Sequence, residues 1–279
     1  MERRGFLLSA AAGTLMAQQT AAGPGALKQC VTGGVFGRGM PFEEMCRHAS
    51  ELGFYGFDLI GPDRWPILKK YNLVPTMMPG PYGGTISDGI GAVENHARLE
   101  KSMHEAIDLC AAAGVPNAIV LAGHRRGMSY EAGADHCVTF LNLVKAHAED
   151  KRINLCLELL NSKVDHKDYL CDHTAFGVGV MQRVNSPRVK LLYDIYHMQI
   201  MEGDIVRTIR DNIQWLAHFH TGGNPGRHEI DGTQELNYRF IAEALKDLKF
   251  EGQIAHEYSP APGRDPIASL KQAKEIFTV

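Results

Sequence analysis

The sequence lacks an apolar run long enough to cross a bilayer. The apolar stretch near the start, Phe6 to Ala17, is shorter than the roughly 18 to 20 residues that a spanning helix needs. No other segment approaches that length. We therefore expect no stable membrane span and a soluble mature protein.

The N-terminal segment resembles an export signal but lacks some of the usual features of one. Arg3 and Arg4 precede the apolar stretch, as in a twin-arginine export signal. The usual polar residue before the arginines is missing, and no clean A-x-A cleavage site follows. We expect a signal peptide over residues 1–25 and periplasmic export, with a cytoplasmic protein as the alternative if this segment is a benign amphipathic extension.

No C-x-x-C pair occurs among the cysteines, which argues against a zinc or thiol redox motif. We expect buried free thiols, and a disulfide stays open for a periplasmic chain. The six cysteines are Cys30, Cys46, Cys110, Cys137, Cys156 and Cys171.

The chain has no large charge excess, because 29 basic residues face 32 acidic ones and leave a formal charge of -3. Such a balance gives no electrostatic basis for nucleic-acid binding. We therefore expect a small-molecule substrate, a keto acid or a ketose, and no nucleic-acid partner. A homo-oligomer is also compatible with the sequence, but the sequence does not determine the oligomeric state.

No low-complexity linker divides the chain, and residues 26–279 have the length of one (β/α)8 barrel. Strand-like and helix-like stretches alternate eight times, which predicts an α/β fold with a single TIM barrel. The expected strands are Lys28 to Val31, Tyr55 to Ile60, Leu73 to Met77, Ala118 to Leu121, Ile153 to Leu159, Val189 to Asp194, Trp215 to His220 and Gly252 to Glu257. The clearest helices are Pro41 to Leu52, Val93 to Ala113, Tyr130 to Asp150, Asp204 to Asn212, Tyr238 to Leu248 and Pro266 to Phe277.

Four of the expected strands, the fifth to the eighth, carry at or next to their last position a residue that can ligate a metal: Glu158, Asp194, His220 and Glu257. A charge at the end of a buried strand costs several kcal/mol unless it is paired or metal-bound. Strand ends of a parallel barrel face one shared site. The pattern therefore predicts a divalent-metal site, and its oxygen-rich donor set suits Mn²⁺, Mg²⁺ or Co²⁺ better than a closed structural zinc site.

Two of these residues also suit proton transfer. Isomerising an α-hydroxy carbonyl compound removes a proton from carbon, and a divalent cation stabilises the resulting enediolate. Glu158 and Glu257 flank the predicted metal and are our candidate base and acid, in an order that the sequence leaves open. Arg227 is the best candidate to bind a substrate carboxylate, and Asn161 and Lys163 are further candidate substrate contacts because they closely follow Glu158.

Several motifs resemble those of the hydroxypyruvate isomerases, within the xylose-isomerase-like barrels that also include the ketose 3-epimerases. The resemblance runs from about Lys28 to the C-terminus. Its motifs are Leu157-Glu158-Leu159-Leu160-Asn161-Ser162-Lys163, Leu192-Tyr193-Asp194-Ile195-Tyr196-His197-Met198-Gln199, Gly226-Arg227-His228-Glu229 and His256-Glu257-Tyr258.

This resemblance implies metal ligation by the four strand-end residues, proton transfer by the two glutamates, and substrate contacts from His197 and Arg227. One position departs from the pattern, since bacterial hydroxypyruvate isomerases tend to carry Gln where this chain has His220, whereas the 3-epimerases carry His. We expect interconversion of hydroxypyruvate and tartronate semialdehyde. The alternatives are a ketose 3-epimerase, a lyase or hydratase acting on an oxidised sugar, and a non-catalytic sugar-binding barrel with a structural metal.

Overall fold

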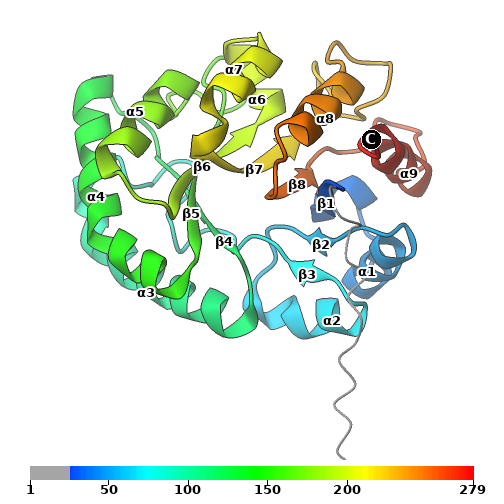
Figure 1. Cartoon of the computed structure of the whole chain (residues 1–279), viewed down its shortest axis with the longest axis horizontal. Coiled ribbons are helices and arrows are strands. Elements are labelled where there is room, and N and C mark those ends of the chain that lie inside the picture. The colour runs from blue at the N-terminus through cyan, green and yellow to red at the C-terminus, as the bar shows by residue number, and fades with distance from the viewer. Residues whose placement is uncertain (1–25) are drawn as a thin grey trace, which may run out of the picture.

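The computed structural model describes residues 26–279 and contains eight parallel strands curled into a barrel with helices outside it (Figure 1). The predicted TIM barrel is confirmed. The strands are β1 (Lys28–Val31), β2 (Gly56–Phe57), β3 (Val74–Pro75), β4 (Asn117–Val120), β5 (Asn154–Leu159), β6 (Val189–Asp194), β7 (Leu216–Thr221) and β8 (Gln253–His256). The helices are α1 (Phe42–Glu51), α2 (Trp65–Lys70), α3 (His96–Ala113), α4 (Tyr130–Lys151), α5 (Thr174–Val184), α6 (Ile195–Met201), α7 (Ile205–Asn212), α8 (Tyr238–Asp247) and α9 (Pro266–Ile276).

A single bridge closes the barrel between its two edge strands. The sheet order is β3-β2-β1-β8-β7-β6-β5-β4, which leaves β3 and β4 at the ends. Met78, just beyond β3, forms a parallel bridge with Ala118 of β4. The Met78 N–H donates to the carbonyl of Asn117 (2.9 Å), and the Ile119 N–H donates to that of Met78 (3.1 Å). Side chains of all eight strands therefore share one interior.

Strands β2 and β3 are much shorter than the sequence predicts. Leu59 adopts a positive φ of 56°, which ends the extended run directly after Asp58. Past Pro75, the Thr76 N–H makes one more backbone hydrogen bond to β2, to the carbonyl of Phe57 (3.0 Å), before the chain leaves this ladder. The apolar pattern gave no sign of either limit, because apolar residues continue to Ile60 and to Met77.

Three helices were not among those that the sequence marks most clearly. α2 and α6 have six and seven residues, too few for a clear periodic pattern. In α5, Gly177 and Gly179 interrupt the apolar spacing, and glycine disfavours helix interiors. The start of α6 is nevertheless encoded locally, since the carboxylate of Asp194 caps it by accepting from the His197 N–H (3.2 Å).

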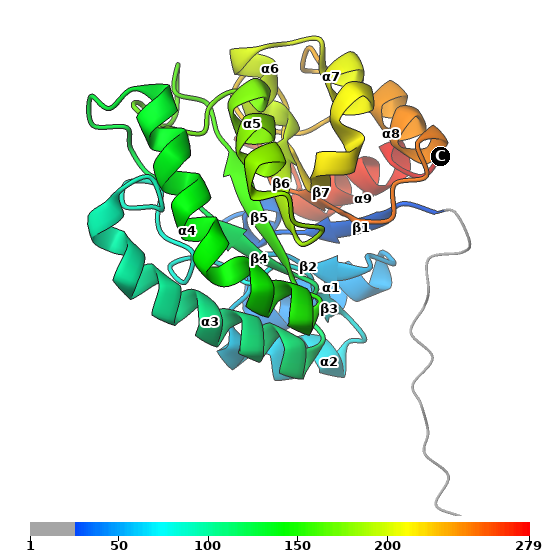
Figure 2. The same ribbon diagram turned by 60° about the vertical axis from the view of Figure 1, so that its left-hand side comes forward.

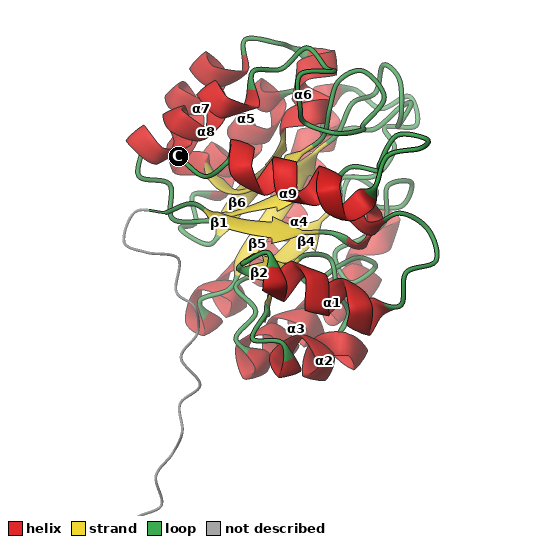
Figure 3. Cartoon of the chain, turned by 90° about the vertical axis from the view of Figure 1, so that its right-hand side faces the viewer, coloured by secondary structure: helices red, strands yellow, loops and turns green. Residues whose placement is uncertain are grey.

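The helices cover the outside of the barrel, with α3 and α4 packed side by side (Figure 2). Long loops gather at the end toward which the strand arrows point (Figure 3). All six cysteines are buried and free, as predicted. Within residues 26–279, no helix is long and apolar enough to cross a membrane. The predicted signal peptide, residues 1–25, lies outside the described residues and stays a prediction.

One glycine lets β2 and β3 approach closely, and its replacement is a first test of the fold. A Cβ added to Gly56 would lie 2.2 Å from the carbonyl oxygen of Val74. We expect Gly56→Ala to lower the free energy of unfolding by about 2 kcal/mol, because backbone must move. Gly179→Ala is the control, since its Cβ meets open space in α5 and should stabilise by about 0.5 to 1 kcal/mol. Equal urea midpoints for the two variants would contradict this account.

Candidate metal centre and active site

The structure brings the four predicted metal ligands together. One ligand atom from each of Glu158, Asp194, His220 and Glu257 can be chosen so that all lie within 4.8 Å of one another. From His220 Nδ1, the distances are 2.7 Å to Glu257 Oε2, 3.4 Å to Glu158 Oε1 and 3.9 Å to Asp194 Oδ2. We call these four residues the ligand cluster.

The strand register explains this convergence. Asp194 and His220 are directly paired between β6 and β7, and His220 pairs with Ala255 of β8. The expected strand ends need small corrections, because β7 continues to Thr221 and β8 stops at His256, one residue before Glu257. Glu257 thus lies in the loop after β8, where its side chain keeps 27% exposure while Asp194 and His220 have none.

The donor set fits a divalent cation. Within residues 26–279, the buried His220 Nδ1 has no hydrogen-bond partner, although Glu257 Oε2 is only 2.7 Å away. A buried ring nitrogen without a partner is costly, and a metal bond would satisfy it. Three carboxylates and one imidazole are ligands that Mn²⁺, Mg²⁺ and Co²⁺ accept. The cluster is therefore a candidate metal centre.

Electrostatics of the cluster also favour a bound cation. Burial raises the pKa of Glu158, and the neighbouring charges of Glu257 and Asp194 raise it further, against the lowering effect of His220. Burial alone would also raise the pKa of Glu257, but His220 and Arg227 outweigh it and hold the pKa at about 2. Burial lowers the pKa of His220, yet the acidic neighbours, Glu257 first, raise it well above its usual value. The carboxylates of the cluster therefore favour a positively charged neighbour, whether a protonated His220, Arg227 or a bound cation.

Arg227 supplies such charge. Its Nη2 donates to Asp194 Oδ2 and to Glu257 Oε2, both at 2.7 Å, and its Nε donates to the backbone carbonyl of Glu257 (3.1 Å). The guanidinium also stacks over the Tyr196 ring, 5.0 Å from its centroid. The predicted substrate-binding arginine thus lies against two of the predicted metal ligands.

His197 and Asn161 lie beside this arginine. His197 is buried on α6, its Nε2 contacts Arg227 Nη1, and Asn161 Nδ2 donates to its Nδ1 (2.6 Å). Burial lowers the pKa of His197 to about 4, so the ring is neutral near pH 7. A neutral imidazole here suits hydrogen bonding to a substrate oxygen, which remains its predicted role.

Lys163 makes its contacts elsewhere. Its ammonium donates to the carbonyls of Ile200 (3.1 Å) and Met201 (2.7 Å), at the C-terminal end of α6. Cations are favoured at that end of a helix. These contacts give Lys163 a capping role and lend no support to its predicted substrate contact.

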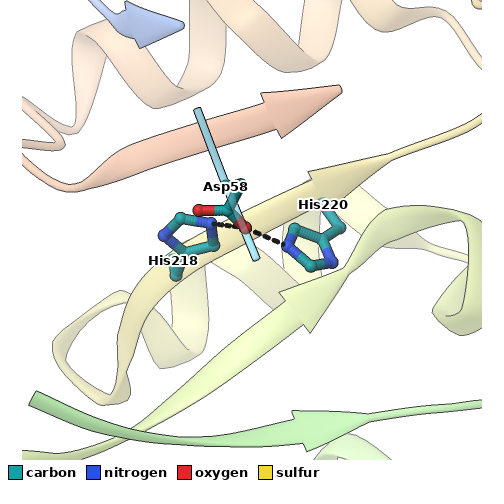
Figure 4. A group of neighbouring side chains, drawn as sticks. All are labelled: Asp58, His218 and His220. Atoms are coloured by element: carbon teal, nitrogen blue, oxygen red, sulfur yellow. Dashed lines mark hydrogen bonds and ion pairs between the residues drawn. The ribbon is translucent and has the colours of Figure 1, made fainter. Parts of the chain in front are cut away.

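Two further residues belong to the site and were not among the predicted site residues. Asp58, directly after β2, and His218, two residues before His220 on β7, are fully buried next to His220 (Figure 4). Asp58 Oδ2 accepts from His220 Nε2 (2.9 Å) and lies 3.2 Å from His218 Nε2. Burial would raise the pKa of Asp58, but His218 and His220 hold it well below its usual range. An acidic residue inside an apolar strand was the available signal for Asp58, and strand alternation was the signal for His218.

Comparison with known proteins identifies the family. The family model described as "Xylose isomerase-like TIM barrel" matches residues 46–277. The chain belongs to this family. The resemblance inferred from the sequence motifs is thereby confirmed at the level of the superfamily.

Individual relatives of this xylose isomerase-like chain are more distant. A Danio rerio protein named "Putative hydroxypyruvate isomerase" is 34% identical over 139 residues, which are 46% of this chain and only 50% of that protein. A Pectobacterium atrosepticum protein named 2-oxo-tetronate isomerase is 24% identical over 237 residues, 79% of this chain and 87% of that one. The crystal structure of a Brucella melitensis protein titled AP endonuclease, family 2, has a TM-score of 0.77 at 25% identity and covers 88% of this chain and 96% of its own.

Proposed function

We propose that this protein is a metal-dependent isomerase that interconverts α-hydroxy carbonyl compounds through an enediolate, with hydroxypyruvate and tartronate semialdehyde as the substrate pair. The observation that carries the proposal is the ligand cluster, in which two glutamates share a site with an imidazole nitrogen free to bind a cation. The names of the Danio rerio and Pectobacterium atrosepticum relatives support isomerisation of a small oxidised sugar or keto acid.

Proton transfer would fall to Glu158 and Glu257. A divalent cation at the cluster, Mn²⁺, Mg²⁺ or Co²⁺, would stabilise negative charge that develops on the substrate oxygens. One glutamate removes the proton from the substrate carbon, and the other returns a proton to the neighbouring carbon, while the hydroxyl proton moves from the oxygen of the first carbon to that of the second. Their environments shift the two pKa values in opposite directions, since the pKa of Glu158 is raised and that of Glu257 is lowered. Such a separation is typical of paired acid and base residues.

Substrate binding would fall to Arg227 and His197. The guanidinium can hold the carboxylate of hydroxypyruvate bidentately. It is near the reacting centre already, through its contacts with Asp194 and Glu257. His197, held by Asn161, would hydrogen-bond a hydroxyl or carbonyl oxygen. These residues orient the substrate carbon toward the two glutamates.

A chelation experiment tests the proposal. Protein treated with a chelator should lose turnover of hydroxypyruvate, and added Mn²⁺, Mg²⁺ or Co²⁺ should restore tartronate semialdehyde formation at least about 100-fold, as expected for loss of charge stabilisation of several kcal/mol. The product is measured by chromatography. Turnover restored by Ca²⁺ is measured in parallel, for comparison with the three proposed cations. A metal-loaded protein that leaves hydroxypyruvate unchanged would remove this substrate.

Ketose 3-epimerisation is the second candidate, and His220 favours it. The hydroxypyruvate isomerases that the motifs resemble tend to carry Gln at this position, whereas the 3-epimerases carry His. The same pair of glutamates could invert a carbon by removing a proton from one face and returning it to the other. Turnover of fructose or tagatose, together with none of hydroxypyruvate, would select this candidate.

A further inference from the structure

Asp58 reaches the metal centre from the opposite half of the barrel. It follows β2, whereas the four members of the ligand cluster come from β5 to β8 and the residue after β8. Its hydrogen bond to His220 joins residues 162 positions apart in the chain. The carboxylate is fully buried, and one of its oxygens lies between the rings of His218 and His220 (Figure 4).

Both carboxylate oxygens of Asp58 are held in place. Oδ1 accepts from the hydroxyl of Thr76 (2.5 Å), just beyond β3, and Oδ2 accepts from His220 Nε2 (2.9 Å). His218 Nε2 is 3.2 Å from Oδ2, and its ring stands nearly perpendicular to that of His220 (83°). With three neighbours around it, the carboxylate has a fixed orientation.

This contact decides which nitrogen of His220 faces the ligand cluster. An ionised carboxylate only accepts hydrogen bonds, so in the neutral form of His220, the form that can bind a cation, the ring proton lies on Nε2 and the lone pair lies on Nδ1. Nδ1 is the nitrogen 2.7 Å from Glu257 Oε2, without a hydrogen-bond partner. In the other tautomer, Nδ1 would carry a hydrogen directed at the carboxylates and could not bind a cation.

We propose that Asp58 is a positioning residue that fixes the tautomer and ring orientation of His220 and so raises the affinity of the centre for its cation. The inference rests on the proposed metal centre. Asp58 acts through His220 and touches neither the cation nor the substrate. A carboxylate behind a ligating histidine typically contributes 10- to 100-fold in metal affinity.

The test compares Asp58→Asn with the parent protein and with Asp63→Asn, a control whose side chain is 79% exposed in the short 3-10 helix Pro62–Arg64 after β2. The side-chain amide that Asp58→Asn introduces could donate a hydrogen to Nε2 of His220 and so favour the wrong tautomer. Calorimetric titration of Mn²⁺ into chelator-treated protein should give an affinity about 10- to 100-fold weaker for Asp58→Asn and unchanged for Asp63→Asn. Thr76→Val, which retains the carboxylate but frees one oxygen, should weaken binding in the same direction by less.

A spectroscopic readout separates positioning from a general loss of structure. In protein labelled with ¹⁵N-histidine, the His220 signals should report a proton on Nε2 in the Mg²⁺-loaded parent and a shift toward Nδ1 in Asp58→Asn. Thr76→Val supplies the same measurement if Asp58→Asn fails to fold, and it should show a partial shift. Unchanged nitrogen signals in a folded variant would overturn the inference.

The outcomes distinguish this inference from the proposed function. A parent protein that binds no divalent cation would end both. Equal Mn²⁺ affinity in the parent and Asp58→Asn would overturn only the role of Asp58. A second cation bound by the parent and lost in Asp58→Asn would also overturn it, because Asp58, His218 and His220 would then be ligands themselves, as their proximity permits.

Discussion

Glu257→Gln is expected to lower turnover of the metal-loaded protein by about 1,000-fold, within the 100- to 10,000-fold range of general acid–base catalysis. The amide has nearly the same shape but cannot take up a proton at neutral pH. Its carbonyl oxygen can still face the cation, so Mn²⁺ binding should weaken while saturation stays within reach. Turnover at saturating Mn²⁺ is therefore the informative measurement.

Glu251→Gln is the matched control, since Glu251 is exposed before β8 and, within residues 26–279, its side chain makes no hydrogen bond; its backbone carbonyl accepts from Lys28. This control should keep parent turnover. Glu158→Gln should resemble Glu257→Gln, because each proton-transfer cycle needs both groups. If Glu257→Gln retained more than a tenth of parent turnover at saturating Mn²⁺, proton transfer by Glu257 would be excluded. A non-catalytic sugar-binding barrel would have no parent turnover to lose.

Arg227→Ala is expected to destabilise the metal-free protein by about 3 kcal/mol and to spare the metal-bound one. Arg227 neutralises Asp194, which is fully buried, and Glu257. Removing one partner of a buried ion pair leaves an uncompensated charge, at a cost of about 3 to 5 kcal/mol. We take the lower limit because the arginine side chain is 24% exposed. Bound Mn²⁺ would supply the missing positive charge, so it should stabilise the variant more than the parent.

Urea unfolding with and without Mn²⁺ measures both effects, and turnover of hydroxypyruvate should fall in the same variant because the substrate carboxylate loses its partner. Arg207→Ala is the control, since Arg207 is 77% exposed and forms an exposed ion pair with Asp204 at the start of α7. Its unfolding free energy should change by less than about 0.5 kcal/mol. A loss of stability in Arg227→Ala that Mn²⁺ does not reduce would show that the arginine does not substitute for a cation.

The strand ends were predictable because local chemistry marks them. Glu158 and Asp194 are carboxylates near the C-terminal ends of apolar strands, where a charge is unexpected unless it has a role. Both lie at the predicted end of the barrel. His220 and Glu257 were displaced by a single residue relative to their strands, which changes the boundary and leaves the face unchanged. For these residues, the alternation of side chains along the strand and the cost of burying a charge both predict the same site.

Other parts of the site depend on contacts between distant parts of the chain. Asp58 lies beyond a strand of two residues, and its partner is 162 positions away. Lys163 is close to Glu158 in sequence, but the loop turns its ammonium toward the end of α6. Proximity along the chain therefore gave no sign of Asp58, and the substrate contact of Lys163 stays a prediction.

The residues of the proposed site are unevenly distributed along the chain. A fragment that begins at β5 would contain the whole ligand cluster together with Arg227 and His197, yet it would lack Asp58 and Thr76. Such a half-barrel, made for protein engineering or fused to an unrelated first half, would inherit the ligands without the carboxylate that orients their only imidazole. A recombined barrel should therefore retain β2 and β3 with the last four strands, even though none of the proposed ligands comes from them.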